Sequence, residues 1–168
     1  MSDALIAVPE AQLHTATPGI RSAHVLDVFY INSGWNTAIT RAVEENLPLL
    51  SNFLKDHRLY VLKREQAQSY MLRHPVVVGA DPVLLVVDRE SAKITPDRGY
   101  GFRLCLGHVR QPEAAVSMMK WAVQVALTAN GAEMCGIVRQ SAHRESFEGT
   151  IELLGEGTGH LLEFAPVV

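Results

Sequence analysis

The strongest apolar signal in the chain is a run of five residues, 83–87 (VLLVV), that lies between Asp81-Pro82 and Asp88. Three of the five are β-branched, and a short continuous apolar run of this kind predicts a strand buried on both faces. Further strands are expected at 24–31 (HVLDVFYI), 58–62 (RLYVL) and 100–106 (YGFRLCL), with a short edge strand at 4–8.

The strand expected at 100–106 has a different pattern. Its apolar residues alternate with Arg103 and Cys105. Strict alternation predicts one buried face and one partly solvated face, so both side chains are expected to be partly exposed.

Apolar residues recur at spacings of three and four over 37–57, which predicts an amphipathic helix that Asn36 or Thr37 caps. Pro48 interrupts the pattern and is expected either to kink this helix or to start a second segment.

Two shorter helical patterns follow. A helix is expected over 64–73, where His74-Pro75 stops it. Another begins at Pro112, which suits a first helical turn, and ends at Asn130-Gly131.

The last part of the chain allows two interpretations. Residues 134–142 fit a helix that Ile151 and Leu154 could continue past Gly149, whereas 150–154 and 160–164 could instead form a hairpin. The spacing favours the helix. The chain then divides into an N-terminal arm (1–22), one domain (23–130) and a helical C-terminal extension (131–168) packed on that domain.

Composition indicates a soluble globular protein, with 48% apolar and 20% charged residues in 168. A net charge of −3 gives no attraction to nucleic acid or to an anionic membrane. Two distant cysteines, Cys105 and Cys135, are expected to be reduced thiols in a cytoplasmic protein. No secretory signal is expected from the N-terminal residues, and no apolar run approaches the ~20 residues that a membrane span needs.

The order strand, helix, strand, helix, strand, strand, helix resembles the thioredoxin fold over roughly residues 24–130. The resemblance implies a three-layer α/β fold around a mixed sheet of about four strands (βαβα then ββα). In thioredoxin-like proteins a cis-proline precedes the central strand and faces the start of the first helix, and Asp81-Pro82 matches that place. Gly107, at the end of the return strand, is similar too.

One departure from the family removes its chemistry. Where a Cys-x-x-Cys motif would follow the first strand, this chain has Ser33-Gly34-Trp35-Asn36, and no cysteine precedes Cys105. Without a thiolate there is no nucleophile for disulfide exchange, so no catalytic residue is predicted.

The candidate binding residues are Ser33, Trp35, Asn36, Asp81 and Pro82. The loop 32–37 lies between a strand end and a helix start, where ligands tend to bind in open α/β sheets. The alternative is that Ser33 and Asn36 only satisfy turn and cap donors while Trp35 packs nearby. Two alternatives are equally open for Asp81-Pro82: a cis bond that faces a ligand, and an ordinary trans proline at the start of a strand.

The remaining motifs give less evidence of a functional site. The sequence 155–160 (GEGTGH) lacks the later glycine and the βαβ unit of a dinucleotide site, so a turn is expected. The seven histidines show no metal-ligand spacing, and neither a metal nor a cofactor is predicted. A set of arginines and a lysine around the hairpin, Arg103 among them, is expected to form a solvated face.

Three functions remain. The first is a binding module for a protein or peptide, with exposed Trp35 and Tyr30 as contact anchors. The second is a glutathione-using enzyme in which Ser33 holds a thiolate at the helix start, as serine-type glutathione transferases do on this fold. The third is a self-associating protein, a homodimer whose arm (1–22) docks on its twin. The sequence favours the first, and with it a protein that is not an enzyme.

Overall fold

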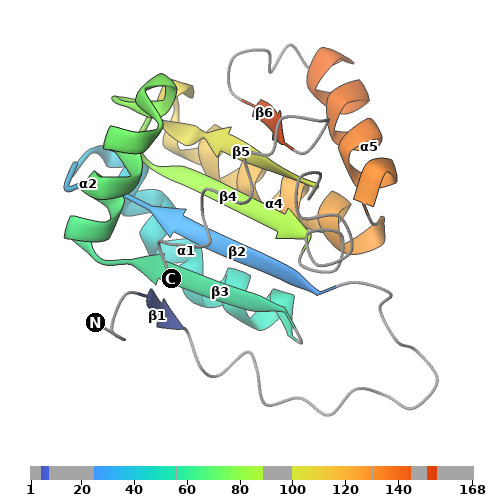
Figure 1. The fold of residues 1–168 in the computed structure, drawn as a ribbon, viewed down its shortest axis with the longest axis horizontal. Coiled ribbons are helices and arrows are strands. Elements are labelled where there is room, and N and C mark those ends of the chain that lie inside the picture. Colours follow the sequence, from blue (N-terminus) through green and yellow to red (C-terminus); the bar gives the residue numbers. More distant parts are fainter. Residues whose placement is uncertain are drawn as a thin grey trace.

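A computed structural model of the chain describes residues 5–7, 25–55, 57–88, 100–129, 131–144 and 151–154. These residues form one mixed sheet of six strands in the order β1-β3-β2-β4-β5-β6 (Figure 1). The strands are β1 (Leu5–Ala7), β2 (Leu26–Ile31), β3 (Arg58–Leu62), β4 (Val83–Asp88), β5 (Gly101–Cys105) and β6 (Ile151–Leu154).

The apolar run at 83–87 is the middle of the sheet. Strand β4 pairs antiparallel with β2 on one side and with β5 on the other, and all six of its residues are buried. The first two long strands, β2 and β3, pair in parallel, as the crossover through the helix between them requires. The prediction of a strand buried on both faces is confirmed.

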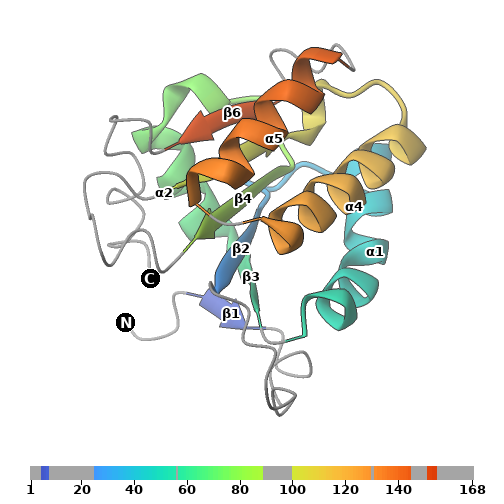
Figure 2. The ribbon, with the colours of Figure 1, turned by 90° about the vertical axis from the view of Figure 1, so that its right-hand side faces the viewer.

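The helices form two layers around the sheet. They are α1 (Ala38–Leu54), α2 (Arg64–Arg73), α4 (Pro112–Thr128) and α5 (Gly131–Arg144), with 3₁₀ turns η2 (Pro75–Val77) and η4 (Leu106–His108). Buried residues of α1, α4 and α5 share one core with one sheet face, and those of α2 and η2 share a second core with the other face. Figure 2 shows the sheet between these layers, so the molecule has a three-layer α/β arrangement.

Helix α1 begins where a cap was expected. The Thr37 side chain accepts a hydrogen bond from the Thr40 N–H, and the Thr40 hydroxyl accepts one from the Thr37 N–H. This reciprocal pair satisfies two of the backbone donors that a helix start leaves open. The helix then continues through Pro48 to Leu54, so Pro48 does not start a second segment.

The sheet is wider than predicted. About four strands were expected and six are found, because β1 adds to the β3 edge and β6 adds to the β5 edge. The expected edge strand at 4–8 therefore exists over Leu5–Ala7.

The C-terminal extension is helical only in part. Helix α5 covers the expected 134–142, but it ends at Arg144, and Ile151–Leu154 form β6 instead of more helix. The partner of β6 is β5, so its pairing satisfies a strand edge that a helix there would have left open. The expected partner segment 160–164 lies outside the described residues. Helix α4 ends at Thr128, and Gly131 already belongs to α5.

The prediction for β5 was wrong, because both of its faces are buried. Arg103 is 1% exposed: its guanidinium donates to the Tyr70 hydroxyl over 3.1 Å and lies 2.7 Å from a Glu152 carboxylate oxygen. Burial alone lowers the pKa of Arg103, but Tyr70 and Glu152 raise it and the net shift is upward. Arg103 is therefore a paired internal charge and does not belong to a solvated face.

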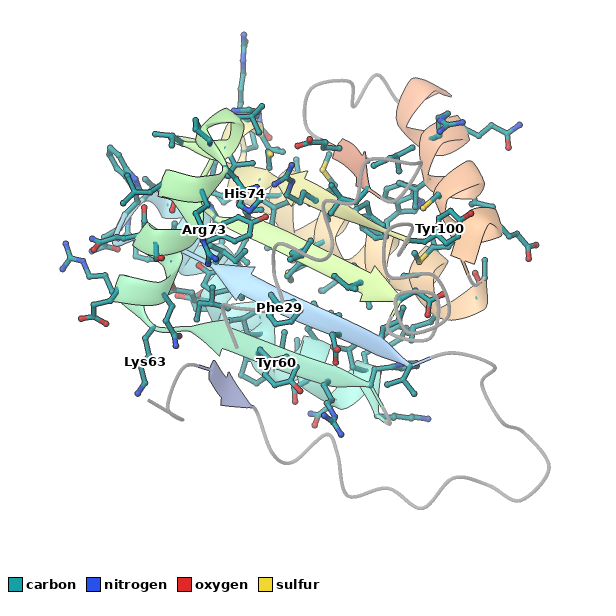
Figure 3. All side chains as sticks on the ribbon, in the orientation of Figure 1. Phe29, Tyr60, Lys63, Arg73, His74 and Tyr100 are labelled. Atoms are coloured by element: carbon teal, nitrogen blue, oxygen red, sulfur yellow. The ribbon has the colours of Figure 1, made fainter. Side chains whose placement is uncertain are left out.

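Aromatic rings lie on the α2 side of the sheet. The Phe29 and Tyr60 rings, from the paired strands β2 and β3, stack with their centroids 5.1 Å apart (Figure 3). The Tyr70 and His74 rings at the end of α2 lie 4.6 Å apart. The first contact adds to the pairing of β2 with β3, and the second lies within the C-terminal end of α2.

Candidate functional site

The loop between β2 and α1 is folded by the side chain of Asn32. Its carbonyl oxygen Oδ1 accepts hydrogen bonds from the backbone N–H of Gly34 (3.3 Å) and Trp35 (3.1 Å). Its amide Nδ2 donates to the Trp35 carbonyl (2.9 Å) and to Glu44 Oε1 (3.3 Å). The Asx turn thus fixes the backbone of the residues that the sequence selected as a candidate site.

The candidate residues Ser33 and Asp81 are in direct contact. The backbone N–H of Ser33 donates to Asp81 Oδ2 over 2.7 Å, and the Ser33 hydroxyl donates to the same oxygen over 2.8 Å. Two donors on one carboxylate oxygen, one of them next to a helix start, are a favourable setting for a negative charge. The sequence placed these two residues side by side, and the structure confirms it.

The segment before β4 packs closely on the end of β5. The Asp81–Pro82 bond is cis, so it is not the ordinary trans proline that the sequence also allowed. Gly107 donates its N–H to the Ala80 carbonyl over 3.0 Å, and a Cβ at this glycine would lie 2.2 Å from the Asp81 carbonyl oxygen. Only a residue without a side chain allows this approach, so Gly107 holds the segment in place.

Asp81 itself is 94% buried (6% exposed) and is only partly paired. Its Oδ1 atom is buried and accepts no hydrogen bond. Within the described part of the chain, nothing pairs with its backbone N–H or its C=O either. Buried polar groups are nearly always paired, so three unpaired polar atoms on one residue mark this position as exceptional.

Exposed apolar side chains occur in the loop that Asp81 contacts and in the segment that leads to Asp81. Trp35 is 58% exposed in the loop that Asp81 holds, and Val76 and Val78 are 68% and 62% exposed in the segment that leads to it. Asn36 is exposed as well, whereas Pro82 is buried. Of the five candidate residues, Asp81 and Pro82 are therefore part of the support and not of the surface.

Tyr30 was predicted to be an exposed anchor, and this was wrong. It is 2% exposed, because β2 turns this side chain into the core beneath α1, where its hydroxyl donates to Glu44 Oε1 over 2.9 Å. Burial and the contact with Glu44 raise the pKa of the Tyr30 hydroxyl well above its usual range.

Several supporting residues were missed by the sequence reasoning. They are Asn32, Glu44 and Gln68, whose amide Nε2 donates to the Ser33 carbonyl over 3.2 Å. The Asn32-Ser-Gly turn signal was visible in the sequence, but the choice of Glu44 and Gln68 depends on how α1 and α2 dock.

The remaining candidates give no reactive centre. Cys105 was expected to be partly exposed, but it is buried, and burial, with Glu152 nearby, raises the pKa of its thiol to about 11. Cys135 is also buried. The described residues contain no group of three or more side chains able to hold a metal ion. The glycine-rich sequence 155–160 lies outside the described residues.

The Ser33–Asp81 contact does not by itself make a nucleophile. The hydroxyl of Ser33 faces a carboxylate, which is too weak a base to generate an alkoxide nucleophile without further help. What the site presents is a fixed loop and an exposed indole, while the unpaired hydrogen-bonding groups of Asp81 are buried.

No helix in the described ranges has the length and apolar character that crossing a bilayer demands. Comparison of the chain with models of protein families, with curated proteins and with solved structures finds no match.

Proposed function

We propose that this chain is a thioredoxin-like domain without dithiol redox chemistry, and that it binds an extended segment of a peptide or protein at the Asp81–Trp35 site. The kinship is supported by the parallel pair β2–β3, the antiparallel pair β4–β5 followed by α4, and the contact between Asp81 and the loop that precedes α1. These are the features on which the sequence resemblance depended.

The observation that carries the binding role is the unpaired state of Asp81 next to exposed Trp35. A backbone N–H and C=O on one residue form the pairing unit that an extended peptide uses when it adds to a sheet. An exposed tryptophan supplies a large apolar contact at little entropic cost, as contact anchors in interfaces do.

The glutathione-using alternative is less well supported. It requires the Ser33 hydroxyl to donate to a thiolate, but this hydroxyl already donates to the Asp81 carboxylate. A thiolate in the same place would face a second negative charge at short range, which disfavours its ionised form. The arrangement therefore suits a neutral peptide backbone better than an anionic sulfur.

A displayed library of linear peptides, selected on the full chain, tests the proposal. Enriched peptides should lose at least about fivefold in affinity with Trp35→Ala, since a truncated anchor typically costs more than about 1 kcal/mol. Phe53→Ala is the matched control, because Phe53 is an aromatic side chain of similar exposure (47%) on α1. Bound peptide should also slow hydrogen exchange at the Asp81 amide.

Two results would contradict the binding role. The first is a selection that enriches no peptide. The second is a set of peptides that bind Trp35→Ala as tightly as the unaltered chain. Calorimetry with glutathione completes the design: heat released with the unaltered chain and lost in Ser33→Ala would favour the enzyme instead.

A further inference from the structure

Arg64 of α2 lies against the loop between β2 and α1. If Gly34 carried a Cβ atom, that atom would lie 2.7 Å from Nε and 3.0 Å from Cζ of Arg64. Gln68, four positions later and so on the same side of the helix, donates to the Ser33 carbonyl over 3.2 Å. This side of α2 therefore packs on the loop, and the Arg64 guanidinium lies at the residue that precedes Trp35.

Gly34 makes this close approach possible. Its φ of +124° is one that residues with a side chain rarely adopt, and a Cβ atom there would displace the guanidinium. The glycine thus leaves a place on the loop backbone that Arg64 fills. The guanidinium is exposed and still has a defined position beside the exposed indole of Trp35.

The positive charge of Arg64 has no protein partner. Within the part of the chain that the structure describes, its guanidinium forms no ion pair and no hydrogen bond. The acidic side chains near the loop are already engaged, because Asp81 Oδ2 accepts two hydrogen bonds from Ser33 and Glu44 Oε1 accepts one from Tyr30. Arg64 is therefore a positioned charge that remains available to a ligand.

Given the proposed peptide-binding role, we propose that Arg64 binds a carboxylate of the peptide, an Asp or Glu side chain close to the apolar residue that contacts Trp35. The guanidinium presents its N–H donors in a planar fork that matches the two oxygens of a carboxylate. Tryptophan and arginine are also the side chains most often found to carry binding energy in interfaces, and here they meet at consecutive positions of one loop.

The charge of Arg64 selects among possible ligands. A peptide with a basic residue in this place would bring like charges together, which disfavours binding. A phosphate carries a charge near −2 and is typically bound by several arginines, whereas one guanidinium matches the single charge of a carboxylate. The whole chain carries a net charge of −3, so a preference for acidic peptides would have to come from the site itself.

The displayed peptide library that tests the binding role also tests the role of Arg64. We expect peptides enriched on the full chain to carry Asp or Glu at a fixed spacing from an apolar or aromatic residue. Arg64→Gln should weaken their binding about fivefold, the upper range for a partly solvated ion pair, and Arg64→Glu should weaken it further. Arg73→Gln is the matched control, because Arg73 is exposed on the same helix but nine positions later, which is half a turn around.

A charge exchange separates this contact from other effects of the substitution. A peptide whose acidic residue is replaced by lysine should bind Arg64→Glu more tightly than it binds the unaltered chain, the reverse of the order for the parent peptide. Peptides that need Trp35, show no acidic preference and bind Arg64→Gln as tightly as the unaltered chain would overturn the role of Arg64 and leave peptide binding intact. A selection that enriches no peptide would overturn both.

Discussion

Removal of the Ser33 hydroxyl should destabilise the fold, because this hydroxyl donates to a buried carboxylate. The donor and acceptor are 2.8 Å apart, and Asp81 is 6% exposed. Hydrogen bonds to charged groups contribute about 1.5–3 kcal/mol, and the lower value applies because Ser33 is only half-buried. Ser33→Ala should therefore cost about 1.5 kcal/mol, or roughly 3–6 °C in Tm for a chain of this size.

A double-mutant cycle isolates the contact from other effects of each change. The free energy of unfolding is measured by urea denaturation for Ser33→Ala, Asp81→Ala and the double variant, with tryptophan fluorescence as the signal. We expect an interaction energy of about 1–2 kcal/mol, the range found for residues in direct contact. Ser117→Ala, at an exposed serine in α4, is the matched control and should change stability by less than about 0.5 kcal/mol.

The cycle also decides between two roles for Ser33. A hydroxyl engaged with Asp81 is a positioning group, whereas a hydroxyl kept available for a ligand would show no coupling. An interaction energy below about 0.3 kcal/mol, within the error of additivity, would refute the contact and reopen the glutathione-using alternative.

Three further changes test the support of the sheet. The pKa of Cys105, raised to about 11 from an ordinary value near 9, keeps its thiol protonated in the fold. This contribution to stability should thus be complete below pH 9 and fall by about 1.4 kcal/mol by pH 10. Cys105→Ala should reduce this loss when the free energy of unfolding is measured by urea denaturation at both pH values. An equal loss in the two proteins would contradict the raised pKa of Cys105. Glu152→Met, which removes the carboxylate paired with buried Arg103, should cost about 2 kcal/mol and more than the double variant with Arg103→Met. The reverse order in thermal melts would count against the pair. Gly107→Ala should cost more than about 3 kcal/mol because its Cβ would meet backbone atoms. Gly136→Ala is the control: its Cβ would lie in open space, so it should be neutral or stabilising by up to about 1 kcal/mol. A Gly107→Ala protein as stable as the parent would refute the close packing.

The sequence predicted the elements whose signals are local. Strand β3 and helix α2 begin and end at the expected residues. The strand is a short run with aromatic and β-branched residues, and His74-Pro75 stops the helix. The central place of β4 also followed from its composition alone. Among the site residues, the proximity of Ser33 and Asp81 came from the family resemblance and not from any pattern in the loop.

The features that could not be predicted from the sequence depend on contacts between distant segments. Alternation along β5 identified which side chains share a face, but it carried no information about what covers that face. Arg103 is buried because Tyr70, 33 residues earlier, and Glu152 on β6 supply its partners. Tyr30 was misplaced for a related reason: a tyrosine next to a turn looks exposed until α1 and Glu44 are docked over it.

The Asx turn at Asn32 has a consequence for kinetics. Its hydrogen bonds and those of Ser33 set the loop backbone without a ligand, so under the proposed binding role a partner would meet a surface that is already in its binding shape. Association would then proceed without a slow rearrangement, at the roughly 10⁵–10⁷ M⁻¹s⁻¹ of ordinary rigid docking. Partners of different affinity would differ chiefly in how long they stay bound.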